Sequence, residues 1–415
     1  MADDTRFSPT TESAATTTPP GSRFPLLPGV RSRMIATSRL AQHIYESGQP
    51  DAEPLVLIHG NASSARFYEE LMASLPQYYI VAPDLRGYGA TESRTVDATR
   101  GLRDFSDDLH ALIEALRLAR FHLLGWSLGG NIAMHYLLDH PERVRTLTLQ
   151  APGSPYGFGC THGPDGQPNY DDFAGSGAGL ISPDLRTHYE AKDTTADSPF
   201  SPRSALRTLY VKPGFQYAPE REDILVEQML LMTIGDNYYP GDSVPSPNWP
   251  FRSPGVYGAN NALSPKYLNQ SGLADLERKP PILWIRGADD QVVSDASLAD
   301  PGNLGKLGVI PGWPGDEVYP SQPMLAQLRA VLDRYAAQGG LYREEVIAAC
   351  GHSPVIEHPD EFRALLTAFL RAAPADTAAP TQPPAEPSTP AVATPSSDET
   401  PHRKRGLLDF LRCPR

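Results

Sequence analysis

The chain has 415 residues, of which 40% are hydrophobic, and a formal net charge of −13. So acidic a balance disfavours nucleic acid and anionic membrane surfaces as partners. Its three cysteines, Cys160, Cys350 and Cys413, are far apart and fit neither a disulfide framework nor a zinc site. We therefore expect no metal, no organic cofactor and no nucleic acid partner.

Residues 1–30 are rich in Thr, Ser and Pro and contain no apolar segment of the kind that a secretory signal carries. We expect this stretch to be a disordered arm. No run in the chain approaches the roughly eighteen apolar residues that a membrane span requires. A cytoplasmic protein without a membrane span is the default expectation.

Residues 31–152 alternate short apolar runs with helical patterns, which is typical of a mostly parallel sheet. The runs at 34–37 and 40–45 predict an opening hairpin, and 105–118 has helical periodicity. After the run at 79–82, Asp84 and Arg86 are expected to form an ion pair that stabilises a turn.

An apolar run at 55–58 ends in His59, Gly60 and a small polar loop. An oxyanion that forms on an attacked carbonyl needs fixed donors, and main-chain N–H groups at such a strand end are suited to this task. Asn61 is the predicted donor of this loop. His59 is expected to be a structural turn residue.

Ser127 lies within Gly-Trp-Ser-Leu-Gly at 125–129, between an apolar run at 120–124 and a helical pattern at 130–138. A strand, a sharp turn with a serine and a helix form the nucleophile elbow. The flanking glycines relieve crowding in the strained turn. The sequence therefore predicts Ser127 as the nucleophile and the N–H of Leu128 as the second oxyanion donor.

The alternating pattern breaks at 153–278, where Gly, Pro, Tyr, Asp and Asn are frequent and one helix is expected at 225–232. We interpret this stretch as a lid inserted between two halves of the sheet, because a lid excludes water and shapes the substrate site. A second insertion is expected at 296–320, after the next strand.

Residues 279–372 complete the predicted core. A buried strand at 281–286 ends in Gly-Ala-Asp-Asp at 287–290, and His352 follows a later strand at 342–350. Serine, acid and histidine in this chain order are expected when they sit on successive loops of a hydrolase sheet. Cys350 is expected to be a buried strand residue, and an amphipathic helix is predicted at 359–370.

With these stretches in view, the chain resembles the lid-bearing α/β-hydrolase superfamily over about 30–372, and 153–278 matches least. The matching stretches are LVLIHGNASS, VAPDLRGYGATES, FHLLGWSLGGNIAMHYLLDHPERV, ILWIRGADDQVV and CGHSPVIEHPDEF. The resemblance implies an α/β-hydrolase fold with Ser127 as nucleophile, His352 as base and Asp290 as acid, and Asp289 remains the alternative acid. The HGN start is also similar to that of haloalkane dehalogenases. Their nucleophile is an aspartate, from which this chain departs.

Residues 373–402 consist mostly of Ala, Pro, Thr and Ser, and we expect them to be a disordered linker. The linker leads to a short basic and apolar tail at 403–415. Two interpretations of this tail stay open: it docks on a protein partner, or it is a frayed end.

The predicted activity is hydrolysis of a carboxylic ester or lactone of small size through an acyl-enzyme. Two alternatives stay open. The first is a C–C bond hydrolase that acts on diketone-like substrates with the same residues. The second is a ligand receptor that keeps the residues but turns over slowly.

Overall fold

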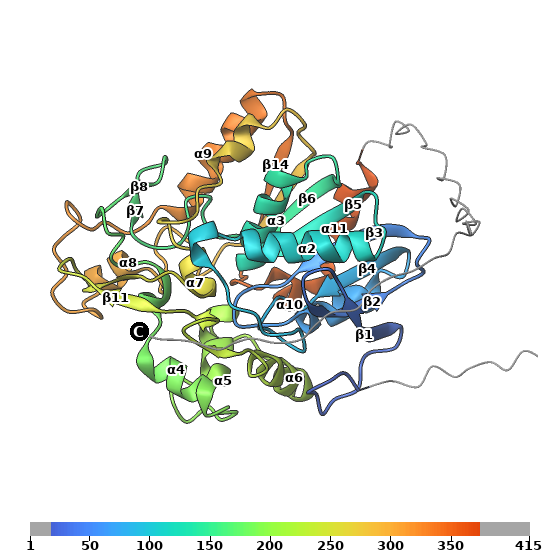
Figure 1. The fold of residues 1–415 in the computed structure, drawn as a ribbon, viewed down its shortest axis with the longest axis horizontal. Coiled ribbons are helices and arrows are strands. Elements are labelled where there is room, and N and C mark those ends of the chain that lie inside the picture. The colour runs from blue at the N-terminus through green and yellow to red at the C-terminus, as the bar shows by residue number, and fades with distance from the viewer. Residues whose placement is uncertain (1–17, 374–415) are drawn as a thin grey trace, which may run out of the picture. The chain divides into compact units, whose positions relative to one another are not determined.

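The computed structural model describes residues 18–373, which form a layered α/β structure around one sheet (Figure 1). The sheet has eight strands, and its first strand pairs antiparallel with the second, as does the second with the third in spatial order. The five remaining pairings are parallel. The predicted mostly parallel sheet and its opening hairpin are confirmed. In spatial order the strands are β1 (Val30–Ala36), β2 (Ala41–Ser47), β4 (Tyr78–Pro83), β3 (Glu53–Ile58), β5 (Phe121–Trp126), β6 (Val144–Gln150), β13 (Ile282–Gly287) and β14 (Tyr342–Ile347).

Helices cover both faces of the sheet. Figure 1 shows α2 (Arg103–Ala115) and α3 (Leu128–Asp139) in front of the central strands and α11 (Pro359–Arg371) behind them. The helix predicted at 105–118 is therefore present as α2, and the one predicted at 359–370 is present as α11. The other helices of the core are η1 (Ala65–Tyr68), α1 (Glu69–Ser74), η2 (Ala98–Arg100), α9 (Met324–Ala337) and α10 (Pro354–Glu357).

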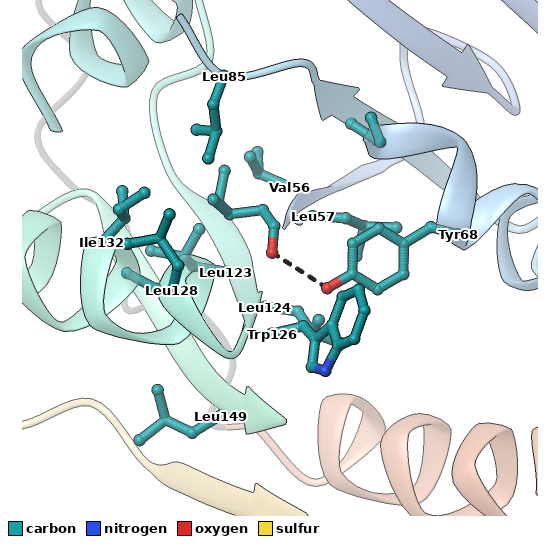
Figure 2. Close-up of a cluster of buried hydrophobic side chains, with 14 of the residues drawn as sticks. Val56, Leu57, Tyr68, Leu85, Leu123, Leu124, Trp126, Leu128, Ile132 and Leu149 are labelled. Carbon is teal, nitrogen blue, oxygen red and sulfur yellow. Dashed lines mark hydrogen bonds between the residues drawn. The ribbon is translucent and has the colours of Figure 1, made fainter. Parts of the chain in front are cut away.

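The central strands of the sheet are buried. Residues 55–58 of β3 are fully buried, and so is nearly all of β5, because parallel strands are covered on both faces. Figure 2 shows the apolar cluster where these strands meet α3 and η1, and the hydroxyl of Tyr68 donates to the carbonyl of Ile58 (3.1 Å). This cluster gives a rigid base to the loops that follow β3 and β5.

The segment between β6 and β13, which the sequence analysis interprets as a lid and which is called the lid below, is built from short elements. The helix expected at 225–232 is displaced: it begins at Pro219, whose fixed φ suits a first helical turn, and ends at Met229. The remaining elements of this region are β7 (Thr161–His162), β8 (Gln167–Pro168), η3 (Gly177–Leu180), α4 (Pro183–Glu190), α5 (Pro202–Ala205), η4 (Leu206–Tyr210), β9 (Ile234–Gly235), β10 (Tyr239–Pro240), β11 (Ser243–Pro245), β12 (Arg252–Pro254), α7 (Ala259–Ala262) and η5 (Ser271–Asp275).

The second insertion follows β13 and contains α8 (Pro301–Lys306). Beside it lies a small apolar cluster, separate from the main core, that includes Cys160, Trp249 and Tyr319. The indole of Trp249 donates to the carbonyl of Pro311 (2.9 Å), so the lid and this insertion are joined by a directed contact.

The expected disorder of residues 1–30 is wrong for residues 18–30. The side chain of Leu26 is buried, and the guanidinium of Arg66 donates to the hydroxyl of Ser22 and the carbonyl of Pro25 (both 2.6 Å). Arg66 is itself buried and paired with Glu69 (2.9 Å). Composition did not predict this order because the partner is a buried arginine far along the chain. Residues 1–17 and the segment from 374, which holds most of the expected linker and all of the tail, lie outside the described residues.

The expected ion pair between Asp84 and Arg86 is also wrong. Arg86 pairs with Asp108 of α2 (2.6 Å), whereas Asp84 contacts the ring of His43 (2.8 Å) and accepts from the N–H of Ala65 (2.9 Å). Both residues stabilise structure, as expected, but each does so through a different neighbour. Both side chains bind residues that are distant in sequence, and local spacing does not predict such partners.

Candidate functional site

Ser127 occupies a strained turn between β5 and α3. Its φ of 55° and ψ of −122° lie in a region that side-chain-bearing residues seldom adopt. The turn is tight: a Cβ added at Gly125 would lie 2.1 Å from the carbonyl oxygen of Gly129, and one added at Gly129 would lie 2.2 Å from that of Ile58. Only glycine fits at these two positions. The strand, serine and helix therefore have the arrangement that the sequence predicts.

Asp290 and His352 meet on neighbouring loops after β13 and β14. Oδ2 of Asp290 lies 2.8 Å from Nδ1 of His352, and Oδ1 accepts from the N–H groups of Val292 (2.8 Å) and Val293 (2.9 Å). Asp290 and His352 are 6% and 3% exposed. Each carboxylate oxygen of Asp290 thus has a hydrogen-bond donor. The contact to Nδ1 fixes the orientation of the imidazole and leaves Nε2 available for other contacts.

Asp289 lies apart from the histidine. Its carboxylate pairs with Nζ of Lys212 from the lid (2.7 Å), and both side chains are close to half exposed. Of the two adjacent aspartates, Asp290 is therefore the one that contacts His352.

The histidine loop lies against the end of β5. The indole N–H of Trp126 donates to the carbonyl of His352 (2.8 Å), and the two rings are 5.6 Å apart. Trp126 directly precedes Ser127. A segment more than two hundred residues away in sequence is therefore fixed beside the turn that carries the serine.

The loop after β3 lies on the other side of Ser127. A Cβ added at Gly60 would lie 3.2 Å from Cβ of Ser127, so the next residue, Asn61, is close to the serine. Within residues 18–373, the main-chain N–H groups of Asn61 and Leu128 have no acceptor. Leu128 is also the first residue of α3, where the helix dipole favours negative charge.

Three residues around Asn61 were not predicted from the sequence. The hydroxyl of Tyr88 donates to Oδ1 of Asn61 (2.6 Å), and Nδ2 of Asn61 donates to Asn260 of the lid (2.8 Å). The hydroxyl of Tyr210, also in the lid, donates to the carbonyl of Asn61 (2.8 Å). No spacing signal links these residues, because two of them lie in the irregular lid. Burial raises the pKa of the Tyr88 and Tyr210 hydroxyls, which stay protonated donors.

Two other candidates have structural surroundings. Nε2 of His59 accepts from the N–H of Leu85 (3.0 Å), and burial lowers the pKa of its imidazole, so His59 is a neutral structural residue, as expected. Cys350 is buried, as expected, but it follows β14 rather than forming part of it. Burial raises the pKa of its thiol, which disfavours a thiolate.

Residues 18–373 hold no group of three or more His, Cys, Asp or Glu side chains placed to ligate a metal ion. None of the helices between these limits is both long enough and apolar enough to cross a membrane.

The chain matches the model of the alpha/beta hydrolase fold family over residues 53–359, and it belongs to that family. Carboxylesterase YbfK of Bacillus subtilis (strain 168) is 34% identical over 115 residues, which are 28% of this chain and 38% of the relative. The 2-hydroxymuconate semialdehyde hydrolase of Pseudomonas sp. (strain CF600) is 31% identical over 121 residues, or 28% of this chain and 42% of the relative. Both alignments span less than half of the relative's own length.

The solved structure of a bacterial membrane phospholipase A has a similar fold. It superposes with a TM-score of 0.50 at 18% sequence identity and covers 83% of this chain and 87% of its own. At this level of identity the likeness shows the α/β-hydrolase fold alone.

Proposed function

We propose that the protein is a serine hydrolase that cleaves a carboxylic ester or lactone of small size through an acyl-enzyme. The observation that carries the proposal is the 2.8 Å contact between Asp290 and His352 on loops held against a strained serine turn. A base oriented by a buried acid beside an elbow serine is the arrangement of nucleophilic acyl transfer.

In the proposed mechanism, Nε2 of His352 takes the proton of Ser127 as Oγ forms a bond to the substrate carbonyl carbon. The carbonyl oxygen becomes an oxyanion, which the N–H groups of Asn61 and Leu128 stabilise. The bond to the leaving oxygen then breaks, and the imidazolium returns its proton to that oxygen. Asp290 holds the imidazole tautomer and stabilises its charged form.

Water completes the reaction in the second half. His352 removes a proton from water as the water oxygen attacks the acyl carbon. The second oxyanion then collapses as the bond to Oγ breaks, and the imidazolium returns the proton to Oγ of Ser127. The products are a carboxylic acid and an alcohol from an ester, or a single hydroxy acid from a lactone. Each step uses side chains and main-chain groups of this chain alone, and the lid residues over the site limit the access of bulk water.

The test is turnover of p-nitrophenyl esters with acyl chains of increasing length, measured with the full chain. Release of p-nitrophenolate that depends on Ser127 supports the proposal, and the preferred acyl length reports the substrate class. Turnover near zero together with melting shifts on addition of ligand would instead favour a slow receptor.

A C–C bond hydrolase is the second candidate, because the Pseudomonas relative is named as a hydrolase of a semialdehyde rather than of an ester. The same proton transfers apply, but the leaving group is carbon. Cleavage of a diketone-like substrate much faster than of any p-nitrophenyl ester would favour this candidate over the esterase.

A further inference from the structure

The lid segment Tyr210–Lys212, called the strap below, contacts the loops on both sides of Ser127. At one end, the hydroxyl of Tyr210 donates to the carbonyls of Asn61 (2.8 Å) and Ala62 (3.0 Å). Ala62 has a φ of 44°, a conformation that is costly for a residue with a side chain. The tyrosine hydroxyl therefore holds the loop of the proposed oxyanion donor in a shape that it does not favour by itself.

The tyrosine ring adds a second restraint. It lies 5.8 Å from the ring of Trp126, in an edge-to-face arrangement, and 6.2 Å from that of Phe67. Trp126 is the residue that fixes the carbonyl of His352. The strap therefore touches the strand end that carries Ser127 as well as the loop of Asn61.

The other end of the strap is fixed to the histidine loop through Glu357. The N–H of Lys212 donates to the carboxylate of Glu357 (2.7 Å). The same carboxylate accepts from the N–H groups of Gly351 (2.9 Å) and Ser353 (3.2 Å), the two neighbours of His352. Glu357 is buried, at 9% exposure, so these three donors have little competition from water.

The approach of the strap to the histidine loop is close. A Cβ added at Gly351 would lie 2.4 Å from the main-chain nitrogen of Lys212. Only a glycine before His352 allows the lid backbone to come so near. The contact between strap and loop is therefore part of the packed structure and more than a single surface hydrogen bond.

We propose that the strap sets the catalytic geometry from the lid, with Tyr210 and Glu357 as positioning residues for the oxyanion loop and for His352. This inference rests on the proposed serine hydrolase function. Displacement of a reacting group by about 1 Å can reduce a rate about a hundredfold, so two anchored loops have a direct effect on turnover. The lid then contributes to the chemical step itself, beyond covering the substrate.

The first experiment compares Tyr210→Phe with Tyr217→Phe in the full chain. Tyr217 is also a partly buried lid tyrosine, but its hydroxyl donates to the carbonyl of Leu206 within the lid (3.3 Å), so it is a matched control. The readout is the rate at which a fluorophosphonate probe labels Ser127, because the phosphoryl oxygen occupies the place of the oxyanion. We expect a roughly tenfold slower rate for Tyr210→Phe and a rate within about twofold of wild type for the control.

The second experiment compares Glu357→Gln with Glu222→Gln. Glu222 is a buried lid carboxylate that pairs with Arg207, away from His352. Glutamine keeps the size of the side chain and weakens the acceptor. We expect Glu357→Gln to lower kcat for p-nitrophenyl esters with KM nearly unchanged and to slow probe labelling, whereas Glu222→Gln affects melting alone. If Glu357→Gln does not fold, the comparison of Tyr210→Phe with Tyr217→Phe tests the proposal by itself.

The outcomes separate the two proposals. A wild-type protein whose Ser127 the probe does not label would refute the proposed function. A labelled wild type whose Tyr210→Phe variant reacts as fast as the Tyr217→Phe control would overturn the strap and leave the hydrolase standing.

Discussion

Two buried aspartates that follow β13 in the chain differ in the hydrogen-bond partners of their carboxylate oxygens. Asp290, in the loop next to His352, has a donor for each oxygen. Asp300, in the insertion that follows, accepts with Oδ2 from the N–H groups of Asn303 (3.1 Å) and Gln322 (3.2 Å), whereas Oδ1 has no partner within residues 18–373. The first carboxylate is arranged to hold an imidazole, and the second begins a short helix. We therefore expect Asp290 to control activity and Asp300 to control stability.

The largest expected effect on activity is that of Ser127→Ala. The hydroxyl adds little to packing, so the melting temperature should barely change, whereas turnover should fall by roughly a thousandfold or more. The measurement is p-nitrophenyl ester turnover beside a melting curve of the same preparation. Retained turnover after removal of host esterases would reject Ser127 as the nucleophile.

Asp290→Asn should lower turnover by about a hundredfold or more, because the imidazole loses its charged partner and its fixed tautomer. Asp289→Asn is the matched control. It removes only the half-exposed pair with Lys212, and such pairs contribute little. Steady-state kinetics of the two variants decide between the aspartates. A larger loss for Asp289→Asn would move the acid by one residue.

Asp300→Asn should change stability and leave turnover unaltered. Burial raises the pKa of Asp300 from 3.8 to about 6, so the folded protein holds this proton more tightly than the unfolded chain does. The stabilisation is complete below about pH 4 and is lost as the pH rises through about 6. At pH 8 the asparagine variant should therefore be more stable than wild type by up to about 3 kcal/mol.

Denaturant unfolding at pH 5 and pH 8 measures this effect. Wild type should lose stability between the two values more than Asp300→Asn does. An identical pH dependence of the two proteins would show that Asp300 does not titrate in this range.

The regular part of the molecule was predictable from the sequence, and the reason is local. Because β3 and β5 are buried on both faces, their sequences are continuous apolar runs. Crowding at positions 125 and 129 admits only glycine, so the turn also leaves a short-range sequence pattern. The order of Ser127, Asp290 and His352 followed from the strands that precede them.

The contacts made by the lid had no such signal. Tyr210 contacts Asn61, which is 149 positions away in sequence. Arg66 binds residues 22 and 25, which precede it by about forty positions. Such pairs depend on how an irregular segment folds back, which periodicity does not encode. Sequence spacing likewise leaves Asp289 and Asp290 undistinguished, and only the long-range contact to His352 separates them.

The smallest expected effect is that of truncation after Ala373. The final helix α11 ends at Arg371, and Leu370 is its last buried side chain. Folding and turnover of small esters should therefore be unchanged without residues 374–415. A large drop in melting temperature would show that the removed segment contributes to the stability of residues 18–373. Loss of a captured protein with activity intact would support docking by the predicted tail at 403–415.

The most direct test of the central claim is to trap the covalent intermediate. The full chain is mixed rapidly with excess p-nitrophenyl ester, quenched in acid and examined by intact mass and peptide mapping. We expect a burst of p-nitrophenolate close to one equivalent per protein and an acyl group on the peptide that contains Ser127, with neither in Ser127→Ala. Sustained turnover of wild type with the acyl group on another residue would contradict the account.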